Sequence, residues 1–200
     1  MVIKVAETEI TVQVFETLDT VDKVLKNKGF KVRDRFELHD NYFTTLESVD
    51  GLDFQTLIAN SVLVRRVVRE DKTEKYILTY KAKNFNSNGD VLSENKVNVL
   101  VDDATKTAEI LRLAGLNNWV NVDNYSIVYK RGDEELCFQD VAGVGLLVEV
   151  EENASMADLT ADEKIAALKA QIVATGFKLG SDFSCKKAMM AYVNESERGK

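Results

Sequence analysis

The segment QDVAGVGLLVEVE, at residues 139–151, alternates apolar and acidic side chains over its last four positions. In a β-strand successive side chains point to opposite faces, so Glu149 and Glu151 share one face with Leu147 and the intervening valines occupy the other. Two like charges side by side repel each other unless water, a cation or basic groups compensate. The segment therefore predicts a strand with one apolar face and a second face that is either solvated or holds something positive.

Similar patterns recur along the chain and predict its secondary structure. Strand-like segments are expected at residues 2–14, 31–45, 61–69, 75–83, 91–101, 119–130, 134–141 and 145–151. Helices are expected at residues 18–28, 103–114, 160–176 and, in a short form, within 182–194. Residues 47–60 are expected to form a loop and residues 84–90 a turn. Because the helices fall between groups of strands, the order predicts an α+β protein built on a large antiparallel sheet or barrel.

Composition and charge restrict the class of protein. With 200 residues, 45% of them hydrophobic, the chain suits one globular domain at residues 1–200. No apolar stretch approaches the roughly 20 residues that span a bilayer, and the chain begins without the apolar region of a signal peptide. We therefore expect a soluble cytoplasmic protein with no membrane partner. The net charge of −7 argues against nucleic-acid binding, which needs a cationic surface, but is compatible with a locally basic pocket.

Residues that bind soft metals or serve as nucleophile partners are few. Cys137 and Cys185 lie far apart without metal-type spacing, so we expect two free thiols. His39 is the only histidine in the sequence, which excludes a His-rich zinc site and makes any Ser-His-Asp triad depend on that residue. The oligomeric state stays open between a monomer and a homodimer.

Several predicted strands carry ionisable side chains on one face. In chain order these are Glu7 and Glu9, Arg65, Lys81 and Lys83, Glu94 and Lys96, and Glu149 and Glu151 with Asp140 just before their turn. One interpretation is the solvated face that antiparallel sheets commonly have. The other is a closed barrel whose lumen carries carboxylates on one wall and Arg and Lys on another. Such a lumen would suit a small polyanion bound with a divalent cation, because carboxylates hold Mg²⁺ or Mn²⁺ and basic side chains neutralise phosphate oxygens.

Four segments favour the barrel through their resemblance to a known family. They are Asp40–Phe43 (DNYF), Val62–Arg66 (VLVRR), Leu78–Lys81 (LTYK) and Phe138–Glu151 (FQDVAGVGLLVEVE). In order and spacing they resemble the Asp-x-Tyr-Phe, Leu-Arg-Ile-Arg, Leu-Thr-Tyr-Lys and Asp-x-Val-x-Gly-Leu-Gly-x-Phe-x-Glu-Ile-Glu segments of the CYTH superfamily, the triphosphate tunnel metalloenzymes. That superfamily includes class IV adenylyl cyclases, inorganic triphosphatases and thiamine triphosphatases.

The resemblance implies an α+β fold made of an eight-stranded antiparallel β-barrel, the triphosphate tunnel, with helices packed outside it. It also implies a small-molecule triphosphate or other polyanion as ligand and Mg²⁺ or Mn²⁺ as cofactor. The implied metal ligands are Glu9, Glu149, Glu151 and Asp140. The implied catalytic groups are Glu149, Glu151 and Lys81. The implied substrate-binding groups are Arg65, Lys81, Arg66 and Lys83. Asp140 has an alternative role as a cap for its turn, and solvent exposure is the alternative for Arg66 and Lys83.

The resemblance is incomplete where charge is expected inside the tunnel. Neutral, apolar or sign-reversed residues stand at Thr11, Gln13, Leu63, Lys96 and Asn98, and an expected Lys-x-Arg pair falls near residues 124–126. Phosphoryl transfer depends chiefly on positioned cations, and loss of one such electrostatic stabiliser costs about a hundredfold to a thousandfold in rate. The loss of several charged tunnel groups together predicts a protein that keeps the fold, because its aliphatic core is intact, but has a lower catalytic rate.

Three functions therefore stay open. The first is hydrolysis of a triphosphate or organic polyphosphate with a divalent metal, with formation of cyclic AMP from ATP ranked below it because nothing selects adenine. The second is a non-catalytic tunnel protein that binds a phosphorylated or other anionic ligand. A structural or partner-binding module is the third, and no exposed motif favours it.

Overall fold

The computed structural model describes residues 8–52, 54–85 and 91–198. Its strands are β1 (Glu9–Gln13), β2 (Lys31–Thr44), β3 (Asn60–Arg69), β4 (Glu74–Phe85), β5 (Val91–Val101), β6 (Asn117–Arg131), β7 (Glu134–Val141) and β8 (Gly145–Glu151). Its helices are α1 (Leu18–Asn27), α2 (Phe54–Ala59), α3 (Ala104–Leu113), α4 (Ala161–Val173) and α5 (Lys187–Arg198), with a 3₁₀ turn at Ala154–Met156.

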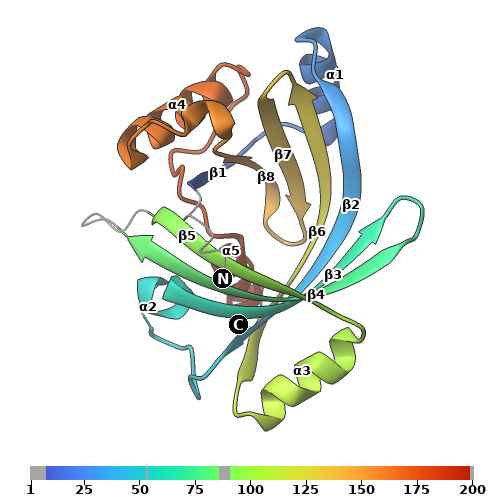
Figure 1. Ribbon diagram of the computed structural model, residues 1–200, viewed down its shortest axis with the longest axis vertical. Coiled ribbons are helices and arrows are strands. Elements are labelled where there is room, and N and C mark those ends of the chain that lie inside the picture. Colours follow the sequence, from blue (N-terminus) through green and yellow to red (C-terminus); the bar gives the residue numbers. More distant parts are fainter. Residues whose placement is uncertain (1–7, 53, 86–90, 199–200) are drawn as a thin grey trace.

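All eight strands form one antiparallel sheet in the order β1-β8-β7-β6-β2-β3-β4-β5. The sheet is strongly curled into a half-barrel, and the helices lie around it (Figure 1). The expected α+β class and eight-stranded antiparallel architecture are thus confirmed. Because β1 begins the sheet order and β5 ends it, the curl brings the side chains of these two edge strands towards each other.

The free edge of β1 is covered by the chain that follows α4. Gly180 donates a backbone hydrogen bond to the Gln13 carbonyl at 2.9 Å, and Cys185 donates one to the Thr11 carbonyl at 3.0 Å. Covering an edge strand satisfies its backbone groups and blocks pairing with other chains. This segment also leads directly into α5, so it fixes where that helix enters the molecule.

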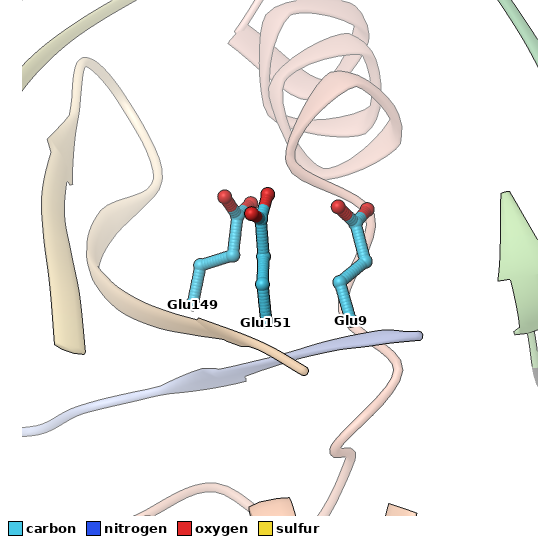
Figure 2. Close-up of side chains that lie close together, drawn as sticks. All are labelled: Glu9, Glu149 and Glu151. Carbon is cyan, nitrogen blue, oxygen red and sulfur yellow. The ribbon is translucent and has the colours of Figure 1, made fainter. Parts of the chain in front are cut away.

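The pair formed by β1 and β8 has two chemically distinct faces. Glu9 lies opposite Glu151 and Thr11 lies opposite Glu149 in its register, so the three glutamates share the concave face (Figure 2). The alternate residues, such as Val12 and Val148, are fully buried on the convex face. The alternation that the sequence predicts for this strand therefore separates a polar lumen from an apolar core.

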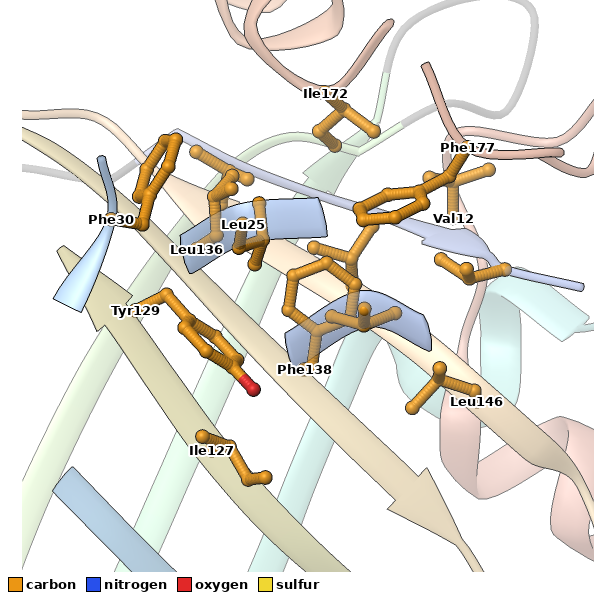
Figure 3. Close-up of a cluster of buried hydrophobic side chains, with 14 of the residues drawn as sticks. Val12, Leu25, Phe30, Ile127, Tyr129, Leu136, Phe138, Leu146, Ile172 and Phe177 are labelled. Atoms are coloured by element: carbon orange, nitrogen blue, oxygen red, sulfur yellow. The ribbon is translucent and has the colours of Figure 1, made fainter. Parts of the chain in front are cut away.

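The largest apolar cluster covers this convex face under α1 and α4 (Figure 3). Phe138 is at its centre, with ring centroids 5.8 Å from Tyr129 and 5.7 Å from Phe177 in edge-to-face geometry. Helix α1 starts at an N-cap provided by Thr17, and α4 starts with the predicted capping box of Thr160 and Glu163. Leu25 of α1 and Ile172 of α4 pack in the same cluster as Val12 and Val148, so both helices cover the strands that carry the glutamates.

Helices α3 and α5 cover other parts of the sheet. Ala108 of α3 packs against Phe43 and Val64 on the convex side. Ala188 and Ala191 of α5 instead pack in one cluster with apolar residues of the sheet, which are Tyr42, Leu63, Val120, Val122, Val141 and Leu147. Leu63 shares a strand face with the lumen residue Arg65, so α5 closes one end of the concave side.

One local expectation differs from the structure. The segment 47–60 is not wholly a loop, since it contains α2, whose Leu57 and Ile58 are buried against Met189 of α5. A six-residue helix depends on such tertiary contacts rather than on a long local periodicity. Residues 2–7 and 86–90, expected as strand and turn, lie outside the described residues. Among the described helices, none is long and apolar enough to cross a membrane.

Candidate metal and anion site

Three carboxylates converge on the concave face. One oxygen from each of Glu9, Glu149 and Glu151 lies within 4.8 Å of the other two (Figure 2). Glu9 and Glu149 are half-buried and Glu151 is exposed. Carboxylate oxygens are the ligands that Mg²⁺ and Mn²⁺ prefer, and three like charges this close need a compensating cation. The donor set therefore fits a hard divalent ion.

Lysines from β4 and β5 approach these carboxylates from across the lumen. Lys83 Nζ lies 3.7 Å from Glu9 Oε1, and Lys96 Nζ lies 4.0 Å from Glu9 Oε2 and 3.8 Å from Glu151 Oε1. Burial opposes ionisation of Glu9, but the positive charges of Lys81, Lys83 and Lys96 outweigh it and hold its pKa below the usual value. Glu9 is therefore an anion in the folded protein at neutral pH.

Glu94 is the most deeply buried acid of the lysine cluster, with 2% of its surface exposed. Its carboxylate lies 2.9 Å from Lys81 Nζ and 3.6 Å from Lys96 Nζ, and accepts a hydrogen bond from Lys83. Burial alone would raise its pKa, but Lys81 and Lys83 lower that pKa to about 2. Glu94 thus holds three ammonium groups in one place.

A second buried network lies beside this cluster. Arg65 donates two hydrogen bonds to Asp40, each of 2.7 Å, and Lys187 of α5 lies 3.9 Å from the same carboxylate. Lys187 also donates a hydrogen bond of 3.1 Å to Gln139. Burial lowers the pKa of Lys187, while the nearby Asp40 opposes that effect. The network thus holds two cationic side chains at the lumen, Arg65 from β3 and Lys187 from α5.

The carboxylates and cations line the same cavity, which has a volume of about 290 Å³. Its charged lining residues are Glu9, Asp34, Arg65, Arg69, Lys81, Lys96, Glu149, Glu151 and Lys187. An apolar wall formed by Phe36, Leu38, Val67 and Ile77 completes it. A second cavity of about 440 Å³ shares Phe36, Cys137, Glu149 and Glu151 with the first. Together they give the lumen the mixed charge that the alternating strands predict.

The structure brings most of the predicted site residues together. Glu9, Glu149, Glu151, Arg65 and Lys81 line the 290 Å³ cavity, and Lys83 lines a smaller adjoining cavity that shares Glu9, Lys81 and Glu149 with it. Lys83 is therefore inside, although solvent exposure was the alternative for it. Glu7 lies outside the described residues.

Asp140 and Arg66 are placed on the other face of the sheet. Gln139 is buried in the lumen lining, and Asp140, next to it in β7, is exposed and lines a shallow hollow with His39 and Asp123. Arg66 is exposed and donates two hydrogen bonds, of 2.6 and 3.0 Å, to the carboxylate of Glu74. The structure thus does not bring Asp140 to the three glutamates or Arg66 to the lumen.

Some lumen residues carry no sequence signal for their role. Lys186 and Lys187 enter the site because the segment along β1 delivers the start of α5 to the lumen. Burial and the nearby Lys83 lower the pKa of Lys186 to about 8. Asp40 lies within a motif of the family resemblance, but its hydrogen bonds to Arg65 follow from the pairing of β2 with β3.

The positions that depart from the family pattern are also placed by the structure. Asn98 accepts a hydrogen bond of 2.9 Å from Thr79, and the Asn124 amide nitrogen donates one of 2.7 Å to Ser126, so each of these neutral side chains has a polar partner. Leu63 is fully buried under α5. Local polar pairs and apolar packing therefore stand where charged groups were expected.

Comparisons with known proteins agree with this fold. No family model matches the chain. A curated protein of Methanocaldococcus jannaschii, named "Putative adenylate cyclase MJ0240", is 26% identical over 160 residues, which cover 80% of this chain and 82% of that protein.

Solved structures show the same architecture. The PH1819 protein of Pyrococcus horikoshii OT3 has a TM-score of 0.68 at 15% identity and covers 97% of this chain and 99% of its own. The PH1012 protein of the same organism has a TM-score of 0.65 at 19% identity, with coverages of 86% and 91%. A Vibrio parahaemolyticus protein, described as a putative adenylate cyclase, has a TM-score of 0.59 at 12% identity, with coverages of 86% and 90%.

The fold and site define a class of antiparallel half-barrel proteins with a charged lumen. Within that class, the resemblance to the CYTH superfamily agrees with the name of the curated relative, a putative adenylate cyclase, and the solved structures show the same fold.

Proposed function

We propose that this protein binds a phosphorylated anion together with Mg²⁺ or Mn²⁺ in its lumen and hydrolyses a phosphoanhydride bond of that ligand. The observation that supports this most directly is the convergence of Glu9, Glu149 and Glu151 on one side of a cavity. Arg65 and Lys81 line the same cavity. Opposed carboxylates and cations in one enclosed space suit a metal–polyphosphate complex better than either component alone.

Acidic and basic side chains of the lumen would have different roles. Glu9, Glu149 and Glu151 would hold the metal, which when bound polarises a phosphoryl group and neutralises developing charge. Arg65, Lys81 and Lys187 would contact phosphate oxygens and orient the polyphosphate ligand. During hydrolysis a water oxygen bonds to phosphorus, the bridging P–O bond breaks with its electron pair on the oxygen of the departing phosphate chain, and a proton of the attacking water passes to solvent.

Non-catalytic anion binding is the main alternative, and one observation favours it. Arg65 and Lys81 are already paired, with Asp40 and with Glu94. Cations that are neutralised by the protein stabilise developing charge in a transition state less effectively than unpaired ones. The protein would then still bind the anion, while hydrolysis is slow or absent.

The relatives suggest a second reaction at the same site. The M. jannaschii protein is named "Putative adenylate cyclase MJ0240", and formation of cyclic AMP uses the ribose hydroxyl of ATP where hydrolysis uses water. The apolar wall of Phe36, Leu38 and Val67 offers a surface for an organic group beside the charged groups. We rank this reaction below hydrolysis because these residues supply no hydrogen bonds that distinguish adenine.

The test measures phosphate release and cyclic AMP formation with tripolyphosphate and with ATP, each with Mg²⁺ or Mn²⁺. Metal-dependent phosphate release that is lost in Glu149→Gln and kept in Asp140→Asn supports the hydrolase, because only the first residue lines the lumen. A thermal shift with tripolyphosphate but no product supports the anion binder. The absence of product and of any thermal shift would overturn both.

A further inference from the structure

Lys96 occupies an unusual place in the site. It is the β5 residue opposite Lys81 of β4, and its ammonium group reaches over to the carboxylates of β1 and β8. Its Nζ lies 4.0 Å from Glu9 Oε2, 3.8 Å from Glu151 Oε1 and 3.6 Å from Glu94 Oε1. Lys96 therefore contacts two of the three carboxylates that form the candidate metal site.

An ammonium group among carboxylates meets the same electrostatic need as a metal ion. It neutralises part of the repulsion between Glu9 and Glu151, and it does so in a partly desolvated place, because 19% of the Lys96 side chain is exposed. A divalent ion that binds the same oxygens must displace the ammonium or accept repulsion from it. Either outcome weakens metal binding to the protein when no anion is bound.

The other charged groups around Lys96 favour its release when an anion is present. Glu94 holds Lys81, Lys83 and Lys96 together, so the three ammonium groups repel one another. A phosphate group in the cavity offers them further acceptor oxygens. Movement of Lys96 towards such an anion would free carboxylate oxygens of Glu9 and Glu151 for a metal.

We propose that the Lys96 ammonium is a built-in cation of the carboxylate cluster, which competes with the divalent metal and makes metal binding depend on the anion. The inference rests on the proposed function, since it concerns the same carboxylates. It makes metal and anion binding mutually reinforcing, because each ligand favours the arrangement in which Lys96 has left Glu9 and Glu151.

The experiment titrates Mn²⁺ into the protein by calorimetry, first without any phosphate compound and then with saturating tripolyphosphate. We expect weak Mn²⁺ binding to the unmodified protein alone and at least tenfold tighter binding to Lys96→Gln. Tripolyphosphate should tighten Mn²⁺ binding to the unmodified protein and do so much less in the variant. Lys23→Gln, which removes one charge from the exposed side of α1, should behave like the unmodified protein.

Two further variants keep the test decisive. Lys96→Arg retains the charge and should retain weak Mn²⁺ binding, and Lys96→Met replaces Lys96→Gln if the latter does not fold. Equal Mn²⁺ affinity in the unmodified protein and the charge-removing variant would overturn the inference, as would a lack of Mn²⁺ binding in both. Because these titrations follow metal binding and not product, the inference can fail while phosphate release is still observed.

Discussion

Arg65 donates two hydrogen bonds to the carboxylate of Asp40 from one edge of its guanidinium group, through Nε and a terminal nitrogen at 2.7 Å each. Asp40 has 1% of its surface exposed, so its charge depends on this partner. Burial opposes ionisation of Asp40, but the charge and hydrogen bonds of Arg65 outweigh it and lower the pKa of the carboxyl. The pair fixes Arg65 in a position from which it lines the lumen.

Asp40→Asn should therefore lower the free energy of unfolding by about 3 kcal/mol, because breaking a buried ion pair leaves an uncompensated charge. Urea unfolding at pH 7 measures the change. Glu74→Gln is the matched control, since it breaks an exposed pair with Arg66 and should have a much smaller effect. Equal losses in the two variants would show that burial does not distinguish these pairs.

Glu94 predicts a specific dependence of stability on acid. Its pKa in the folded protein is about 2, against an ordinary value of 4.5, so the folded state favours the charged form. For a lowered pKa, the stabilisation is complete above the ordinary value and is lost as pH falls from about 4.5 to about 2. The loss attributable to Glu94 should be about 3 kcal/mol, because one pKa unit corresponds to about 1.4 kcal/mol.

The measurement compares urea unfolding at pH 6 and pH 3 for the unmodified protein and Glu94→Gln. The variant should be less stable at pH 6, because Lys81 and Lys83 lose their buried partner. Its stability should also fall less between the two pH values. An equally steep acid dependence in both proteins would mean that Glu94 titrates normally in the fold.

Most strands and the inner face of the sheet could be predicted, because period-two alternation is a local property. The register between strands is not local, and it decides which residues meet. Asp140 shows the difference: Cys137 pairs with Glu149 in the β7–β8 hairpin, so the odd-numbered residues of β7 face the lumen and Asp140 does not. A one-residue difference in register moves a side chain to the other face.

The cations delivered by α5 could not be predicted for a related reason. Lys187 lies 48 residues along the chain from Gln139, the strand residue to which it donates a hydrogen bond, and no spacing rule connects them. The helix enters the lumen because the preceding segment pairs with the edge of β1. Its short neighbour α2 was missed as well, since Leu57 and Ile58 gain their burial from α5 and not from their own helix.

Lys187 nevertheless allows a prediction about anion binding. Its half-buried ammonium lies between Asp40 and Gln139, and Lys187 lines the main cavity. A charge-assisted hydrogen bond from such a group contributes about 1.5–3 kcal/mol, which corresponds to a change of at least about tenfold in affinity. Lys187→Met should weaken tripolyphosphate binding by that factor in calorimetry, and Lys23→Gln should leave it unchanged. Unchanged affinity in Lys187→Met would remove Lys187 from the anion site.

Cys137 reports on the environment of the carboxylates. It lines both cavities, lies opposite Glu149 in the sheet, and has a pKa raised to about 12 by burial and by the charge of Glu149. The thiolate is the reactive form, so alkylation of Cys137 by iodoacetamide in a Cys185→Ser protein should be slow at pH 8. Its rate should rise about tenfold per pH unit up to at least pH 10 without a plateau, because the thiolate fraction rises by that factor.

The rate of Cys137 alkylation is followed by mass spectrometry, and denatured protein, whose thiol titrates at its ordinary pKa, is the control. A plateau near pH 9 in the folded protein would mean that the lumen at Cys137 is as solvated as bulk water, and Glu149 would then lie in a far more polar environment than the structure indicates.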